Sequence, residues 1–190
     1  VPLPPSALPS VISARQNNGA PVLPPHKLAS VYRFNSLNQL TWQKIPDHDQ
    51  PAEFWYDRLG RMVLSQNAVQ RSLMYYSYTL YDALSRIREV GEVRPVTPFT
   101  PSIVKSPGFS AWVLAGQRRQ MTRTRYDESQ NASTAAYFGA TGQQNLRGRV
   151  ASVFYFATNV AQFQTATHYS YDIHGNVNVL IQDITGFDRK

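Results

Sequence analysis

The chain has 190 residues, of which 42% are hydrophobic and 16% are charged, and its formal net charge is +7. This length allows one domain or two small ones, and the hydrophobic share is enough for a substantial core, which excludes a globally disordered chain. The sequence contains no cysteine, so disulfide frameworks, thiolate zinc sites, iron–sulfur clusters and cysteine nucleophiles are excluded.

The positive charge is not concentrated in a nucleic-acid motif. The local excess of Arg118, Arg119, Arg123 and Arg125 is followed by Asp127 and Glu128. This arrangement favours a solvated or shell-lining face, and no nucleic-acid partner is expected. No apolar run approaches the roughly 18 residues that cross a bilayer, and no signal sequence is evident, so no transmembrane segment is expected. Because residue 1 is Val, we expect the chain to be a piece of a longer protein.

The N-terminal part is rich in proline, with seven of the thirteen prolines in the first 25 residues. Proline fixes φ and removes a hydrogen-bond donor, so we predict a Pro-rich extended linker or docking segment over residues 1–27, without helix or central strand. From residue 28 to 190, short runs rich in Tyr, Val, Thr and Phe alternate with turn residues, which predicts a β-sheet. A second Pro-rich stretch at about 93–107 is predicted as an irregular excursion. The best helix window, 132–147, contains two glycines and is not predicted to be helical.

A seven-residue motif recurs along the sheet region. Three copies share Tyr-Asp, a two-residue spacer, a small residue, a polar residue and an apolar residue: Tyr56-Asp57-Arg58-Leu59-Gly60-Arg61-Met62, Tyr81-Asp82-Ala83-Leu84-Ser85-Arg86-Ile87 and Tyr171-Asp172-Ile173-His174-Gly175-Asn176-Val177. A degenerate copy begins at Phe34, and Tyr126-Asp127 begins another whose continuation is lost. Internal repeats of this kind indicate a repeat architecture.

The spacing of the copies supports this alignment. Their first positions are residues 34, 56, 81, 126 and 171, so the last two intervals are about twice the first two. We therefore predict that each long interval hides a copy without its Tyr-Asp, and Leu146–Val150 is predicted to be the remnant of one.

The motif is typical of a β-hairpin turn. An aromatic residue ends one strand, Asp accepts hydrogen bonds from backbone amides downstream, and Gly supplies a positive φ before the next strand begins. At the Gly position the second copy has Ser85, which predicts either a strained left-handed conformation or a different turn type.

These residues resemble the YD repeats of Rhs proteins, which are also found in Tc-toxin C subunits and in animal teneurins. The resemblance covers about residues 28–183, and 54–90 and 168–183 are its clearest parts. It implies an all-β fold of antiparallel hairpins that forms a section of a curved or spiralling shell. In bacterial relatives such a shell encloses a toxic C-terminal polypeptide, and in teneurins it belongs to an adhesion ectodomain. Rhs proteins commonly end the shell with an Asp-Pro-x-Gly-type motif that cleaves the chain, but this sequence has no Asp-Pro dipeptide. We therefore expect no protease activity here.

Other candidate chemistry is sparse. The four histidines are scattered, and Asp47-His48-Asp49 lies between two prolines, which is typical of an exposed turn. The repeated aspartates recur once per hairpin, which favours turn capping over paired-carboxylate catalysis or calcium binding. We predict no catalytic residue, no metal site and no cofactor.

The leading hypothesis is a non-enzymatic structural section of a secreted or cell-surface bacterial protein that encloses or scaffolds a partner polypeptide. Its partners would be neighbouring repeats or another chain of an assembly, with a possible enclosed cargo. The alternative is a carbohydrate- or receptor-binding adhesion module, in which Trp55, Tyr76 and Tyr78 would form the binding platform. Cross-strand aromatic pairing is the structural explanation for the same residues.

Overall fold

The computed structural model describes residues 8–16, 29–158 and 162–187. These residues contain ten strands, and the hydrogen-bonded order of the strands is their order in the sequence. The pairings are antiparallel. The predicted all-β class built from antiparallel hairpins is therefore confirmed.

The strands are β1 (Val31–Phe34), β2 (Leu40–Lys44), β3 (Ala52–Tyr56), β4 (Met62–Gln66), β5 (Tyr76–Tyr81), β6 (Ile87–Arg94), β7 (Gln117–Tyr126), β8 (Val150–Thr158), β9 (Thr165–Tyr171) and β10 (Val177–Ile184). The helices are short: α1 (Leu8–Gln16), α2 (Ala68–Ser72), η2 (Ile103–Lys105), α3 (Phe109–Ala115), α4 (Ala132–Ala136) and η3 (Gly139–Thr141). None of the described helices is long and apolar enough to span a membrane.

The chain divides into two compact units, residues 1–54 and residues 55–190, and the division falls within β3. In the first unit β1 pairs with β2, and β2 pairs with the start of β3. The Arg33 guanidinium lies 4.6 Å from the centre of the Trp42 ring and joins the first two strands. The boundary after residue 27 that the sequence suggested stays a prediction.

Helix α1 corrects the expectation of an extended N-terminal segment, because residues 8–16 are helical. Pro9 is the second residue of the helix, where the backbone N–H of any residue would lack an intrahelical acceptor. Residues 10–16 contain no further proline, so they can continue the helix. The rest of the predicted linker, residues 1–7 and 17–27, lies outside the described residues.

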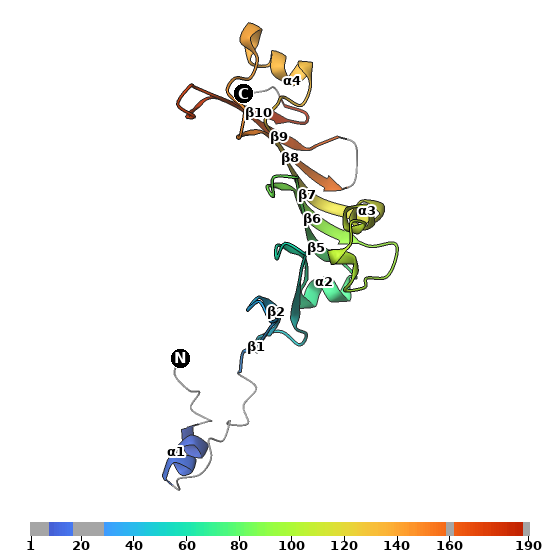
Figure 1. Cartoon of the computed structure of the whole chain (residues 1–190), viewed down its shortest axis with the longest axis vertical. Helices are drawn as coiled ribbons and strands as arrows, with labels where there is room; N and C mark the ends of the chain where they lie inside the picture. Colours follow the sequence, from blue (N-terminus) through green and yellow to red (C-terminus); the bar gives the residue numbers. More distant parts are fainter. Residues whose placement is uncertain (1–7, 17–28, 159–161, 188–190) are drawn as a thin grey trace. The chain divides into compact units, whose positions relative to one another are not determined.

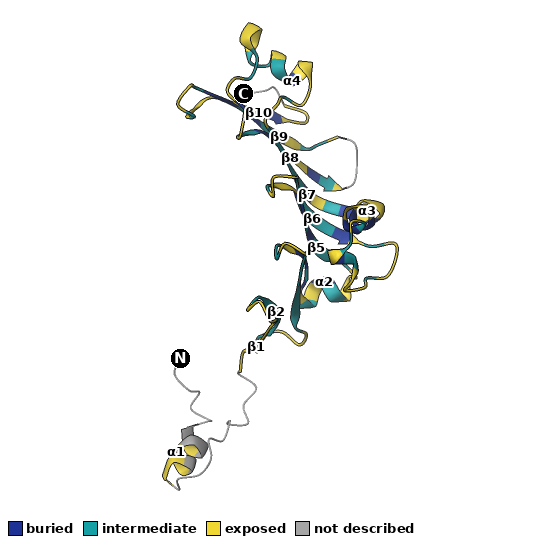
Figure 2. Cartoon of the chain, in the orientation of Figure 1, coloured by how far each residue is buried: buried dark blue, intermediate teal, exposed yellow. Residues whose placement is uncertain are grey.

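Among the described residues, the second unit has a large buried cluster that includes residues of α3 and a smaller one that contains Leu146, Ala151 and Tyr171. The large cluster forms the main core. The buried apolar side chains come from β4 to β9 and include Leu64, Leu80, Val93, Met121, Phe154 and Phe156. Trp112 and Val113 of α3 pack against this cluster. Figure 1 shows α3 on one side of strands β5 to β7, and Figure 2 shows buried residues on these strands.

Helices α3 and α4 were not expected from the sequence. Helix α3 follows directly on the Pro-rich excursion and is seven residues long, too short for an apolar periodicity to be recognised. Helix α4 lies inside the glycine-containing window, where the Asn131 side chain accepts a hydrogen bond from the Thr134 N–H at 2.8 Å. This cap compensates for the low helix propensity of the window.

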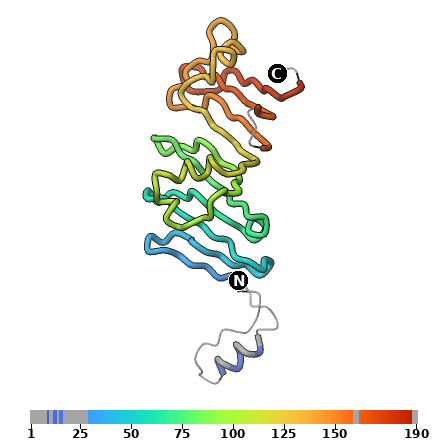
Figure 3. Tube along the Cα trace, turned by 90° about the vertical axis from the view of Figure 1, so that its right-hand side faces the viewer, coloured from blue at the N-terminus to red at the C-terminus, as the bar shows by residue number. Residues whose placement is uncertain are grey.

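In a sheet of sequential antiparallel strands, successive connections lie alternately at opposite ends of the strands. In the second unit, the connections that contain the repeated motif join β3 to β4, β5 to β6, β7 to β8 and β9 to β10, so they all lie at the same end. Helix α2 and the excursion with α3 lie in connections at the opposite end. Figure 3 traces this back-and-forth course of the chain.

Candidate functional site

The side chain at the second position of the motif, usually Asp, closes each repeat turn. In the first full copy, Asp57 Oδ1 accepts the backbone N–H groups of Leu59 at 2.9 Å and Arg61 at 3.0 Å. Asp57 Oδ2 accepts the Arg61 Nε–H at 2.8 Å. The backbone of the same two residues also pairs, since the Asp57 N–H donates to the Arg61 carbonyl at 2.9 Å. The carboxylate thus satisfies the turn and fixes the arginine that follows it.

The same bonds recur in three other turns. Asp82 Oδ1 accepts the N–H groups two and four residues later, both at 2.9 Å, and its Oδ2 accepts from Arg86 Nε at 2.6 Å. Asp172 repeats this pattern with Asn176 in the arginine position. In the first unit, the degenerate copy uses Asn35, whose Oδ1 accepts from the backbone N–H groups of Leu37 and Gln39. The turn therefore requires a side-chain oxygen at this position more than it requires a charge.

The fifth position of each of these turns is left-handed. Gly60 has φ of 75° and Gly175 has φ of 92°, while Ser85 has φ of 63° and Asn38 has φ of 58°. Ser85 thus adopts the strained alternative foreseen from the sequence, and the turn type is unchanged.

The copy that begins at Tyr126 is split by an insertion. The Asp127 N–H donates to the Arg149 carbonyl at 3.1 Å, and Asp127 Oδ1 accepts the Gly148 N–H at 2.7 Å. Residues 146–150 are therefore the second half of this copy, and 128–145 are inserted between the halves. The prediction that they are the remnant of a separate copy was wrong.

The other long interval, between residues 81 and 126, also holds no hidden copy. Its extra length is the connection between β6 and β7, which contains η2 and α3. The doubled spacing therefore has a different cause in each interval. The first is lengthened by a long connection between β6 and β7, and the second by an insertion that splits a repeat turn.

Tyrosine hydroxyls join each repeat turn to the preceding hairpin. Each donates to the carbonyl of the apolar residue that ends the motif before it: Tyr81 to Met62 at 3.0 Å, Tyr126 to Ile87 at 3.0 Å and Tyr171 to Val150 at 2.8 Å. Partial burial raises the pKa of Tyr81 and of Tyr171, so these hydroxyls remain protonated donors at neutral pH.

Arginines make the reciprocal connection. The guanidinium carbon lies over the ring of the next tyrosine: Arg61 over Tyr81 at 4.3 Å, Arg86 over Tyr126 at 4.2 Å and Arg149 over Tyr171 at 5.5 Å. Arg86 also donates to both carboxylate oxygens of Asp127, at 2.7 and 3.2 Å, and Arg61 donates to Ser85 Oγ at 2.9 Å. We call this series of contacts between consecutive motif tyrosines, aspartates and arginines the repeat-turn ladder.

The electrostatics of the ladder favour the ionised side chains. For Asp82, desolvation alone would raise the pKa, but hydrogen bonds from the backbone and side chain of Arg86 outweigh it and lower the pKa. The Arg86 side chain lowers the pKa of Asp127, and Asn176 lowers that of Asp172. The hydrogen bonds that Arg86 donates to Asp127 and Asp82 raise the pKa of Arg86. A low carboxyl pKa suits a permanent acceptor better than a general acid.

The described residues contain no group of three or more His, Asp or Glu side chains placed to hold a metal ion. Each motif aspartate instead binds groups of its own turn or the arginine of an adjoining turn. These contacts are the ones that turn-capping aspartates would make.

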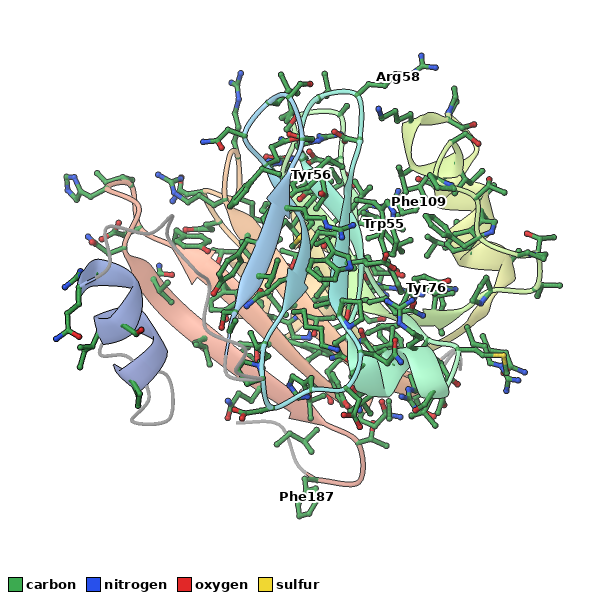
Figure 4. All side chains as sticks on the ribbon, turned by 90° about the horizontal axis from the view of Figure 1, so that it is seen from below. Trp55, Tyr56, Arg58, Tyr76, Phe109 and Phe187 are labelled. Atoms are coloured by element: carbon green, nitrogen blue, oxygen red, sulfur yellow. The ribbon has the colours of Figure 1, made fainter. Side chains whose placement is uncertain are left out.

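The proposed aromatic platform lies within the packed side of the second unit. Trp55 and Tyr76 contact Phe99, with ring centroids 4.7 and 5.4 Å apart, and Tyr78 is 2% exposed. Figure 4 shows Trp55 and Tyr76 on the side of the strands that faces the ribbon carrying Phe109, whereas Arg58 extends away from its turn. A flat ligand therefore has no free face of Tyr78 on which to stack.

A buried ion-pair cluster next to this core was not foreseen. Glu89, 5% exposed, accepts from the Tyr78 hydroxyl at 2.6 Å, Arg118 at 2.8 Å and Arg123 at 2.5 Å. Burial would raise the pKa of Glu89, but these donors lower it, and burial raises the pKa of Tyr78. The sequence predicted a solvated or shell-lining face for the arginines of β7, and the solvated alternative is wrong for Arg118, which is 9% exposed.

The other two arginines on β7 also form ion pairs with acidic residues outside that strand. Arg119 binds Glu92 on β6, and Arg125 binds Glu128 after β7. Glu89 and Glu92 lie opposite Arg123 and Arg119 in the strand pairing. The presence of acidic residues on β6 and arginines on β7 is the sequence signal that could have predicted these cross-strand ion pairs.

A groove of about 780 Å³ lies next to this cluster. It is lined by side chains of the β5–β6 turn, β6, α3, β7, β8 and the segment before β9. Its aromatic lining is Tyr126, Phe154, Phe156 and Phe163, and its arginines are Arg86, Arg88, Arg123 and Arg125. We call it the Arg–Phe groove.

Comparison with known proteins gives only distant structural similarity. No family model matches the sequence, and no curated protein matches it. The crystal structure of TcdB2-TccC3-TEV is similar at 12% identity and a TM-score of 0.35, over 94% of this chain and 10% of that chain. The structure of TcdB2-TccC3 without its hypervariable C-terminal region gives 11% identity and a TM-score of 0.29, over 98% and 10%. The chain spans about a tenth of these chains, and its repeat-family membership stays a prediction.

Ser85 provides a direct test of the turn conformation. Ser85→Gly and Ser85→Ala both remove the exposed hydroxyl that accepts from Arg61, but only Gly adopts the left-handed conformation without steric cost. We expect the Gly variant to be more stable than the Ala variant by about 1 kcal/mol, measured as the free energy of unfolding in urea. Equal stability of the two variants would show that φ at this position is not positive.

The lowered pKa of Asp172 predicts an acid-dependent loss of stability. Because its pKa is lower in the folded chain than in the unfolded one, its contribution is complete above about pH 4 and disappears as the pH falls through the folded value. Asp172→Asn should therefore lose less unfolding free energy between pH 5 and pH 2.5 than the unchanged chain does, and Asn35 shows that Asn is compatible with this turn.

Asp47→Asn serves as the matched control, because Asp47 is exposed and lies outside the repeat turns. The slope of stability against pH should change less in this control. Identical slopes for Asp172→Asn and the unchanged chain would contradict the proposed stabilisation of the carboxylate.

Proposed function

We propose that the chain is a non-enzymatic section of a longer β-shell wall that encloses or scaffolds a partner polypeptide. The observation that carries this proposal is the repeat-turn ladder. Its tyrosines, aspartates and arginines form hydrogen bonds within the turns and between consecutive hairpins. Such nearest-neighbour contacts are how repeat proteins extend a wall unit by unit.

The last strand supports continuation of this wall. Among the described residues, β10 pairs only with β9, and side chains on it such as Val179 and Leu180 are 43% and 47% exposed. An exposed apolar edge strand favours pairing with a further strand. We propose that neighbouring repeats or another chain of an assembly cover it, in a secreted or cell-surface protein.

The adhesion-platform alternative receives no comparable support. Trp55 and Tyr76 pack against Phe99, and the Tyr78 hydroxyl is bound to Glu89. These contacts suit a structural role for the three rings.

Limited proteolysis of the natural full-length product tests the proposal. We expect any enclosed polypeptide to be cut at least tenfold more slowly in the assembled product than when the same polypeptide is expressed alone, because a wall excludes the protease. The control is a peptide of the same composition added free to the assembled product, which should be cut at its ordinary rate. Equal rates for assembled and isolated polypeptide would contradict enclosure.

A further inference from the structure

We propose that the Arg–Phe groove binds an extended segment of the partner polypeptide in which a carboxylate side chain lies close to a large apolar one. The inference rests on the proposed function and specifies the chemistry of the partner. It is argued from the apolar side chains and the arginines that line the groove.

Part of the groove lining is apolar. The Phe163 ring lies 5.4 Å from the ring of Phe154 and 6.5 Å from that of Phe156, at an interplanar angle of 90° to the second. Phe154 and Phe156 are only 4% and 6% exposed, whereas Phe163 is half-buried and Leu114 of α3 is 44% exposed. Because Phe163 is held by packing against the two buried rings, an apolar side chain of a ligand would meet a preformed surface.

Arg88 supplies the free hydrogen-bond donors. It is exposed and makes no ion pair with any residue that the structure describes. Its planar guanidinium can donate two parallel hydrogen bonds to one carboxylate. A ligand carboxylate beside Arg88 would therefore be favoured.

The charge of the lining selects the sign of the ligand. Four arginines face three carboxylates around the groove, namely Asp82, Glu89 and Glu128. All three carboxylates already accept hydrogen bonds from arginines of the lining: Asp82 from Arg86, Glu89 from Arg123 and Glu128 from Arg125. Arg88 is the lining arginine without an ion pair among the described residues. A ligand carboxylate would therefore gain the planar donors of Arg88, whereas a ligand ammonium would approach this arginine unfavourably.

The size of the groove favours several residues over a single side chain. Its volume of about 780 Å³ is in the range of sites that hold whole ligands. Arg88 lies on β6 and Leu114 lies on α3, so a ligand must span two elements to contact both. An extended polypeptide presents neighbouring side chains at suitable intervals for this.

Binding of two short peptides to the full chain tests the proposal. The probes are fluorescein-labelled GEFELG and its counterpart GKFKLG, measured by fluorescence anisotropy at 0.15 M salt. We expect saturable binding of the acidic peptide and at least tenfold weaker binding of the lysine peptide. Arg88→Ser and Leu114→Ser should each weaken binding of the acidic peptide at least threefold.

The matched controls are Arg58→Ser and Leu84→Ser. Both residues are exposed and lie on repeat turns, and neither of their side chains lines the groove. They should leave the affinity unchanged, and thermal melts should show that all four variants are folded. Absence of saturable binding, equal binding of the two peptides, or equal effects of groove and control variants would overturn the proposal. Competition by octanoate as strong as that by unlabelled GEFELG would also overturn it, because it would assign the groove to a small amphiphile.

The outcome is separable from that of the proteolysis experiment. If the groove binds no peptide while an enclosed polypeptide remains protected, the groove assignment fails and the wall function stands. If the peptide binds as expected but no polypeptide is protected, the wall function fails and the groove remains a peptide site.

Discussion

The structure depends on one recurring constraint, the closure of each hairpin turn by a side-chain oxygen. Asp57, Asp82 and Asp172 each accept two backbone N–H groups of their own turn, which would otherwise lack partners within it. The second carboxylate oxygen holds the Arg or Asn that begins the next strand. The turn therefore sets the direction of the arginine, and in the copies with Arg61 and Arg86 the arginine reaches the next tyrosine ring.

This constraint also explains how the conspicuous polar residues of the motif are used. The motif aspartates are hydrogen-bonded, and the pKa values of Asp82, Asp127 and Asp172 are lowered, whereas a general acid at neutral pH needs a raised carboxyl pKa. Arg88, which is exposed and makes no ion pair with the described residues, lies elsewhere, in the Arg–Phe groove. The turn contacts and the proposed binding are thus assigned to different residues of the same sheet.

The sequence predicts the strands and most turns because their determinants are local. Asp at the second position and Gly at the fifth position, where one copy has Ser85, specify the turn within seven residues, so the copies at Tyr56, Tyr81 and Tyr171 are recognisable without structure. The split copy was misassigned because its halves, at Asp127 and Gly148, meet only after 20 intervening residues fold away. The Glu89 cluster and the groove depend on strand register and on α3, which alternation alone does not determine. Helix α1 was missed because Pro9 was read as a helix breaker, although the first turn tolerates proline.

The most direct test of the ladder removes its tyrosine hydroxyls and leaves the rings in place. Tyr81→Phe, Tyr126→Phe and Tyr171→Phe should each lower the free energy of unfolding by about 1 kcal/mol, because each deletes one hydrogen bond to the preceding hairpin. Tyr155→Phe is the control, since the Tyr155 hydroxyl makes no hydrogen bond to the described residues and the ring is 38% exposed. The account predicts a loss in the three motif variants and almost none in the control. Equal stability of all four variants and the unchanged chain would contradict the claim that the motif tyrosines join consecutive hairpins.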